Sequence, residues 1–237
     1  MFDKNLVWNN NVYNNYLDYL KSIKDSDDFK SFNNKLITTK DKMIGIRVPK
    51  LRKLAKEISK TNIVSFLNNV KNDYYEEILV EGFVIGSITN KELFNKHFLE
   101  YIKKIDNWAT CDMVISSCKI MKKDNSYYNY ACDFIKQKDA FIVRVGLVMM
   151  LDHYINDDYI DDILIRIDKI NNDNYYVKMA IAWLISMCFV KYKEKTFNYL
   201  KKNNLDKFTY NKAIQKIIES LRVSAEDKKT LKEMKNK

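Results

Sequence analysis

Apolar residues recur at helical spacing along most of the chain. One clear face within residues 49–60 is formed by four side chains, Leu51, Leu54, Ala55 and Ile58, and this spacing is typical of an amphipathic helix. Pro49 stands where a first-turn residue of that helix is expected. With four Gly and one Pro in the whole chain, few positions favour hairpin turns. The pattern predicts an all-α protein whose helices are joined by short polar turns.

The apolar helices also repeat along the chain. Five segments open with an aromatic residue and continue as an apolar helix, and they start at Tyr75, Trp108, Phe141, Tyr176 and Tyr210. Their period of roughly 33 to 35 residues is expected for stacked helical pairs, which form a solenoid with a concave face. We therefore predict a single solenoid domain over residues 1–237, with a loose arm at residues 1–11 and a charged helix or tail at residues 224–237.

Composition and charge narrow the class of partner. Apolar residues make up 46% of the chain and charged residues 30%, which excludes a disordered chain because enough apolar side chains are present to close a core. Lys and Arg number 41 against 31 Asp and Glu, a formal net charge of +10. Polyanions are therefore the natural class of partner.

Several other classes are excluded by short segments. The longest apolar run, near residues 179–190, is shorter than the roughly 20 residues of a membrane-spanning helix. The opening residues MFDKNLVWNN lack the pattern of a secretory signal, so we predict a cytoplasmic protein with no membrane partner. The four cysteines form no C-x-x-C pair and only two histidines, His97 and His153, accompany them, so we predict reduced thiols and no metal cofactor.

Trp108 and Asp112 stand four residues apart in DNWATCD. This spacing places both on one face of a helix, for which Asp106 is the expected N-cap. Both side chains are candidates for contact with one ligand. The alternative is a core Trp beside an Asp that caps the helix or faces solvent.

Two polar or amphipathic residues lie in later apolar helices. Arg144 is the single cation of AFIVRVGLVMM, and it either extends to solvent along its aliphatic stem or binds phosphate. Trp183 lies in YYVKMAIAWLISM, the most apolar helix of the chain, where filling of the core is the alternative to contact with a ligand.

A basic segment precedes and enters the helix that follows Pro49. GIRVPKLRKLAKEISK carries four candidate DNA-binding residues, Arg47, Lys50, Arg52 and Lys53, around the N-terminal half of the helix, where the helix dipole also attracts phosphate. A charged face that contacts only solvent is the alternative.

Five segments together resemble the DNA alkylation repair family, and in particular its AlkD-type alkylpurine DNA glycosylases. They are GIRVPKLRKLAKEI, DNWATCD, FIVRVGLVMM, YYVKMAIAW and NKAIQKIIES, in the family's order and at its repeat spacing. The resemblance spans nearly the whole chain. It implies a right-handed HEAT-like-repeat α-solenoid of antiparallel helix pairs, in which a basic concave cleft of a monomer holds duplex DNA.

The resemblance also implies a site, residue by residue. Active members of the family place a Trp, an Asp four residues later, an Arg one repeat later and a second Trp two repeats later around the DNA, and these positions match Trp108, Asp112, Arg144 and Trp183. By resemblance, Asp112 stabilises positive charge on deoxyribose, the two Trp side chains contact sugar and backbone, and Arg144 holds phosphate. Two features depart from the active members: residues 21–43 leave room for only a short helix, and Ser186 stands where some relatives have Arg.

The function implied by the resemblance is hydrolysis of the N-glycosidic bond of cationic N3- or N7-alkylpurines in DNA. Such a base already carries positive charge, so it leaves without a general acid, and the enzyme has chiefly to stabilise an oxocarbenium-like transition state. Two alternatives stay open. One is a non-catalytic HEAT-like module that binds a DNA structure, and the other is a protein-interaction scaffold with its positive charge spread evenly.

Overall fold

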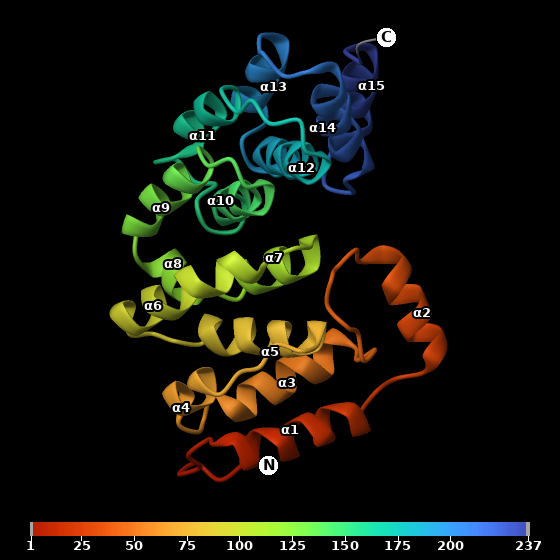
Figure 1. Cartoon of the computed structure of the whole chain (residues 1–237). Helices are drawn as coiled ribbons and strands as arrows, with labels where there is room; N and C mark the ends of the chain where they lie inside the picture. The colour runs from red at the N-terminus through yellow and green to blue at the C-terminus, as the bar shows by residue number, and fades with distance from the viewer. Residues whose placement is uncertain (1, 236–237) are drawn as a thin grey trace. The chain divides into compact units, whose positions relative to one another are not determined.

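The computed structural model describes residues 2–235, and these residues are mostly α-helical (Figure 1). The helices are α1 (Asn10–Ser22), α2 (Asp27–Leu36), α3 (Val48–Ile58), α4 (Ile63–Asn68), α5 (Tyr75–Gly86), α6 (Lys91–Tyr101), α7 (Trp108–Ile115), α8 (Lys119–Lys123), α9 (Ser126–Phe134), α10 (Ala140–His153), α11 (Ile160–Ile167), α12 (Tyr175–Lys191), α13 (Lys193–Lys201), α14 (Lys207–Glu219) and α15 (Ala225–Glu233). A 3-10 turn, Ile102–Lys104, follows α6. Within residues 2–235 the only β pairing is an isolated bridge between Lys42 and Tyr74. The all-α prediction is confirmed.

Polar side chains define where the helices begin. Nine N-cap residues accept hydrogen bonds from first-turn amides, which would otherwise lack partners: Asn9, Ser26, Asn62, Asn90, Asn107, Asp139, Asn174, Asp206 and Ser224. Helices α5 and α7 begin at the predicted Tyr75 and Trp108, α10 and α12 begin one residue before Phe141 and Tyr176, and α14 begins three residues before the predicted Tyr210. Local sequence therefore determines these boundaries.

The chain divides into two compact units, Met1–Ile120 and Met121–Lys237, and α8 crosses from one to the other. The single domain expected over residues 1–237 stays a prediction. Residues 1 and 236–237, which belong to the predicted arm and tail, lie outside the described residues.

In the first unit, α3, α5 and α7 pack against one another in chain order (Figure 1). All residues of α5 are buried, and its three glutamates, Glu76, Glu77 and Glu81, are accommodated there because each carboxylate has hydrogen-bond or ion-pair partners. The predicted core face of α3 is confirmed, because its buried residues are Leu51, Leu54, Ala55 and Ile58. Helix α2 has no buried residue, so it lies outside this core.

The start of the chain is anchored to the first unit. Trp8, within the segment expected to be a loose arm, is only 3% exposed. Its indole Nε1 donates to Thr61 Oγ1 at 2.8 Å, and its ring lies 4.9 Å from that of Phe66. Burial of a large aromatic ring against α4 supplies the apolar contact that holds this segment in place.

In the second unit, α12 lies between α10 and α14, and α9, α11, α13 and α15 pack on these three helices (Figure 1). Helix α9 approaches α10 closely at Gly146, where a Cβ atom would stand 2.7 Å from the carbonyl oxygen of Ala131. A short charged helix, α15, ends the described chain, as predicted for the C-terminal segment. None of the described helices is long and apolar enough to cross a bilayer.

Candidate functional site

Asn107 begins the helix that carries Trp108 and Asp112. Its side chain is fully buried and accepts from the amides of Ala109 and Thr110 at 3.0 Å each. The prediction that Asp106 caps this helix was wrong by one residue. Asn and Asp are almost equally good N-caps, so the choice between these neighbours depended on which one faces the core.

Asp106 instead holds the segment that follows α2. Its carboxylate accepts from Thr39 Oγ1 at 3.0 Å and from the amide of Lys40 at 2.9 Å. The nearby Asp41 has a pKa raised above its ordinary value, first by burial and then by the charge of Asp106. A segment about 67 residues away in sequence is thereby fixed at the start of α7.

The indole of Trp108 is half-buried, and its orientation is defined by a hydrogen bond. Nε1 donates to the carbonyl oxygen of Leu36, the last residue of α2, at 3.1 Å. Asp112, four residues later on α7, is also partly exposed. Neither side chain is fully buried, so both retain surface that a ligand can reach.

A buried carboxylate supports the loop before α3. Glu76 on α5 is fully buried and accepts from the backbone amides of Ile44, Gly45 and Ile46 at 2.9, 2.7 and 3.2 Å. Gly45 has a φ of +97°, a conformation that L side chains rarely adopt. These contacts fix the chain where it enters the basic helix. Hydrophobic patterning had missed Glu76, since a Glu within YYEEILVEG gives no sign of what it binds.

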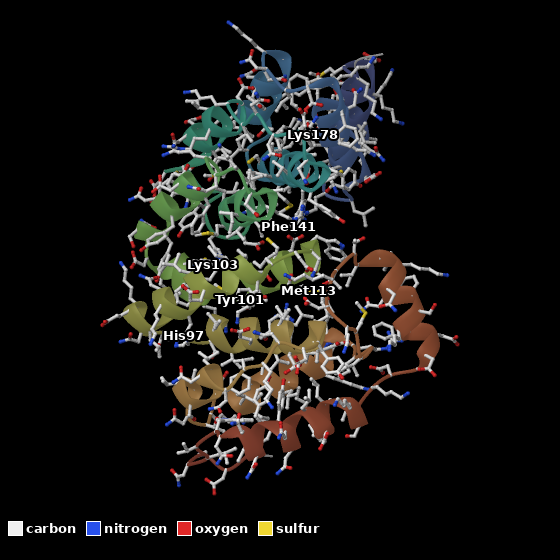
Figure 2. The ribbon with its side chains drawn as sticks, in the orientation of Figure 1. His97, Tyr101, Lys103, Met113, Phe141 and Lys178 are labelled. Carbon is white, nitrogen blue, oxygen red and sulfur yellow. The ribbon has the colours of Figure 1, made fainter. Side chains whose placement is uncertain are left out.

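Arg52 links the basic helix α3 to α7. Its Nη2 donates to the carbonyl oxygen of Met113 at 3.2 Å, and its guanidinium carbon lies 4.2 Å from the centroid of the Phe83 ring. Met113, labelled in Figure 2, directly follows Asp112. The structure therefore brings one predicted DNA-binding cation to the helix that carries Trp108 and Asp112.

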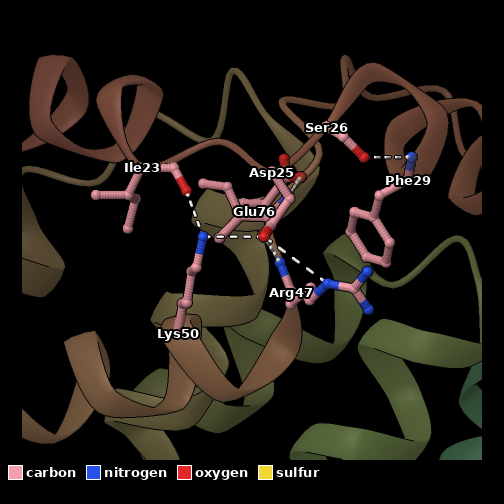
Figure 3. A network of polar contacts seen from close by, with 8 residues as sticks. Ile23, Asp25, Ser26, Phe29, Arg47, Lys50 and Glu76 are labelled. Atoms are coloured by element: carbon pink, nitrogen blue, oxygen red, sulfur yellow. Dashed lines mark hydrogen bonds and ion pairs between the residues drawn. The ribbon is translucent and has the colours of Figure 1, made fainter.

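Arg47 and Lys50 share one carboxylate (Figure 3). Asp25 accepts from the amide of Arg47 at 2.9 Å and from Lys50 Nζ at 3.0 Å, and Arg47 Nε lies 3.7 Å from it. These interactions, with the Arg47 amide first, lower the pKa of Asp25. The Arg47 guanidinium also lies over the Phe29 ring at 4.4 Å. Both cations stay solvent-exposed, so their structural contacts leave surface for a polyanion.

Lys53 completes the predicted basic set. It is exposed on α3, and within residues 2–235 no carboxylate pairs with it. The four cations predicted from GIRVPKLRKLAKEISK thus all lie at the start or in the first two turns of α3.

Arg144 and Trp183 belong to the second unit. Arg144 on α10 is only 6% exposed, and its Nη1 donates to the carbonyl oxygen of Tyr176 at 2.7 Å. Extension to solvent was the wrong alternative for this residue, because the guanidinium is held inside the unit. Trp183 on α12 is half-buried, so it is not a core residue. Ser186 is buried and donates to the carbonyl oxygen of Trp183 at 2.7 Å.

The cysteines are reduced, and the described residues offer no cluster of metal ligands. All four cysteines are buried and none forms a disulfide. Burial raises the pKa of the Cys188 thiol to about 12, which disfavours its thiolate form. Across the described part of the chain, no group of three or more His, Cys, Asp or Glu side chains is arranged to hold a metal ion.

Comparison with known proteins gave one match. The family model described as DNA alkylation repair enzyme matches residues 17–217. That span runs from α1 to α14 and includes every predicted site residue. No curated protein and no solved structure matched the chain.

Proposed function

This chain belongs to the DNA alkylation repair enzyme family, and on that premise we propose that it is a DNA glycosylase that releases cationic N3- or N7-alkylpurines from duplex DNA. The observation that carries the proposal is the pairing of Trp108 and Asp112 on α7. Both are partly exposed, and the indole is fixed by its hydrogen bond to Leu36.

The chemistry needs few groups. The bond between C1′ of the sugar and the purine nitrogen breaks, and both electrons leave with the base, which becomes neutral. Water adds to C1′ and loses a proton, which leaves an abasic sugar. The Asp112 carboxylate stabilises the positive charge that develops on the sugar, and the electron-rich face of Trp108 supports the same cation.

Two residues of the second unit, Arg144 and Trp183, also belong to the proposed set of DNA contacts. Arg144 binds a phosphate of the duplex and Trp183 contacts the sugar and backbone beside the lesion. In the right-handed HEAT-like solenoid that the family resemblance implies, Arg47, Lys50, Arg52, Lys53 and Arg144 are the cations that would bind DNA phosphates. Support comes from the helix starts, which follow the predicted repeat at Tyr75, Trp108, Phe141 and Tyr176 within one residue.

One observation favours a second candidate function, a non-catalytic module that binds DNA structure. Ser186 is buried and its hydroxyl is bound to the carbonyl of its own helix, so no cation is present one turn beyond Trp183. Helix α2 is also short, Asp27–Leu36. In a purely binding protein, Asp112 is dispensable.

The test is release of free methylated purines from alkylated duplex DNA incubated with the full chain. Asp112→Asn keeps the size of the side chain but removes its charge, and we expect it to lower excision by about 10² or more, as for loss of a preorganised electrostatic partner. Its DNA affinity should hold or rise because a negative charge near phosphate is lost. Asp133→Asn is the matched control, because Asp133 is exposed on α9 and pairs with nearby Lys136 at 2.9 Å.

If the wild type releases no purine from any alkylated duplex, the glycosylase proposal is wrong. If Asp112→Asn then binds DNA as well as the wild type does, the binding-module function replaces it.

A further inference from the structure

Four aromatic rings form a row across three helices of the second unit. Phe141 is the second residue of α10, Tyr175 and Tyr176 open α12, and Phe208 is the second residue of α14. Their centroids lie 5.2 Å apart from Phe141 to Tyr176, 5.6 Å from Tyr176 to Tyr175, and 6.1 Å from Tyr175 to Phe208. Because corresponding helix starts carry a ring, the row runs from α10 to α12 and on to α14.

Two rings of the row are far more exposed to solvent than the rings in the core of the same unit. Tyr175 is 57% exposed and Phe208 is 39% exposed, although both are large apolar rings. In the core of the same unit, rings such as Tyr127 and Tyr154 are almost fully buried. The outer part of the row therefore presents ring surface to solvent.

Positive charge surrounds the exposed end of the row. Lys212 Nζ lies 5.9 Å from the centroid of the Phe208 ring. The surface hollow at this ring is lined by Lys207, Phe208, Asn211, Lys212, Gln215 and Lys235, a set without a carboxylate. Two acidic groups near the row are engaged: Asp206 is the N-cap of α14, and Lys178 Nζ lies 3.5 Å from Asp206 and 2.9 Å from Asp173. Lys178 and Phe141 are labelled in Figure 2.

We propose that this aromatic row is a binding surface for unpaired bases of single-stranded DNA, with the lysines of the hollow as phosphate contacts. Exposed rings among cations are the combination that binds single strands, because every base has a face that stacks on an aromatic ring and the backbone is a polyanion. Bases in a duplex cannot use these rings, since their faces are covered by the neighbouring base pairs. A protein partner that sought only apolar surface would not match a hollow with three lysines.

Arg144 connects the row to duplex binding. Its guanidinium donates to the carbonyl oxygen of Tyr176, a member of the row, so the row begins beside the cation assigned to a duplex phosphate. The inference rests on the proposed function for the choice of DNA as the ligand. It extends that function to duplexes that carry a single-stranded overhang or gap, which the row would hold next to the paired region.

Fluorescence anisotropy of the full chain tests the inference with two DNA probes. Both are the same duplex with the same overhang length, but in one the overhang nucleotides are abasic, so charge is kept and stacking is lost. We expect the wild type to bind the normal overhang more tightly, by about tenfold for each base stacked. In Tyr175→Ala/Phe208→Ala the ratio of the two dissociation constants should fall close to one.

Two further variants keep the result interpretable. Tyr19→Ala removes an equally exposed ring on α1, 51% exposed, and should leave the ratio at the wild-type value. Tyr175→Phe keeps the ring without the hydroxyl, so it should keep the wild-type ratio of dissociation constants as well. The circular dichroism spectrum of the double variant shows whether it folds normally. If the double variant is misfolded, Tyr175→Leu, which keeps apolar bulk but no ring, takes its place.

A wild-type ratio near one would overturn the inference. So would an equal loss in Tyr19→Ala, because the rings would then act without regard to position. Excision of alkylpurines from blunt duplex is a separate measurement. If the protein prefers the overhang with bases but releases no purine, the inference about the aromatic row is supported and the glycosylase proposal is wrong. If it releases purines but binds both overhangs equally, the glycosylase proposal is supported and the inference about the row is wrong.

Discussion

At the scale of single residues, the buried carboxylates of α5 show how polar groups are accommodated in a core. Glu76 accepts three backbone amides, Glu81 pairs with Lys104 Nζ at 2.7 Å, and Glu77 accepts from Tyr13 Oη and from the amide of Tyr74. Each carboxylate thus has partners that compensate its loss of hydration. Without those partners, an acidic residue at these positions would destabilise the unit.

Glu77 gives a testable pH dependence. Burial raises the pKa of this carboxyl above its ordinary value, although the hydrogen bond from Tyr13 opposes the shift. The folded state therefore binds more protons than the unfolded chain between the ordinary pKa of about 4.3 and the raised one. It follows that the stability contributed by Glu77 is fully present below that window and is lost as the pH rises through it. We expect the unfolding free energy of the wild type minus that of Glu77→Gln to fall across this window, measured by urea unfolding at a series of pH values.

Glu100 is the control, because its contribution to the unfolding free energy should change with pH in the opposite direction. Glu100 is exposed, and its hydrogen bond with Lys103 lowers its pKa, so its contribution is lost as the pH falls through the lowered value. The same difference taken with Glu100→Gln should rise with pH. If the unfolding free energy of the wild type minus that of Glu77→Gln stays constant or rises with pH, burial does not raise the pKa of Glu77 as inferred.

At the scale of helices, close packing in the second unit depends on a glycine. A Cβ at Gly146 of α10 would meet the Ala131 carbonyl oxygen at 2.7 Å and the Ile135 amide nitrogen at 3.1 Å. Both are backbone atoms of α9 or its C-cap, so they cannot yield as a flexible side chain does. The separation of α9 and α10 is therefore set by the absence of a side chain.

Gly146→Ala should destabilise the protein despite the higher helix propensity of Ala. The propensity gain is about 1 kcal/mol, whereas overpacking of this kind costs about 1–3 kcal/mol and here acts on backbone. We expect a net loss in unfolding free energy, measured by urea unfolding. Asn198→Ala at an exposed position of α13 should be neutral or slightly stabilising. Stabilisation by Gly146→Ala would show that α9 can move away without cost.

At the scale of the whole molecule, the net charge of +10 should govern DNA binding. If five cations contact phosphate, the logarithm of the binding constant should fall against the logarithm of salt concentration with a slope of about −4.5. Lys53→Ala should make this slope shallower by about 0.9, because Lys53 is exposed and pairs with no carboxylate among residues 2–235. Titration by anisotropy at several salt concentrations measures the slope.

Lys195 provides the comparison for the salt measurement. It lies on α13 and pairs with Asp161 at 2.7 Å, away from the predicted DNA-binding residues in sequence. Lys195→Ala should leave the slope unchanged. Binding that is insensitive to salt, or absent at low salt, would contradict the proposed basic surface.

The sequence by itself determined the helical class, the starts of α5, α7, α10 and α12 to within one residue, and the core face of α3. These features depend on residues within one or two turns of each other: apolar spacing selects the buried face, and a polar cap fixes the first turn. The pairing of Trp108 with Asp112 on one face was predictable for the same reason, since four residues make about one helical turn.

Only the tertiary structure decided which groups surround that pair. The contacts of Trp108 with Leu36, of Asp106 with Thr39 and of Arg52 with Met113 join residues more than 60 positions apart. Hydrophobic periodicity describes one helix at a time, so it does not say which distant carbonyl or hydroxyl meets a given side chain. For the same reason Asp106 was mistaken for its neighbour Asn107 as the cap, because the two differ chiefly in which one the folded unit buries.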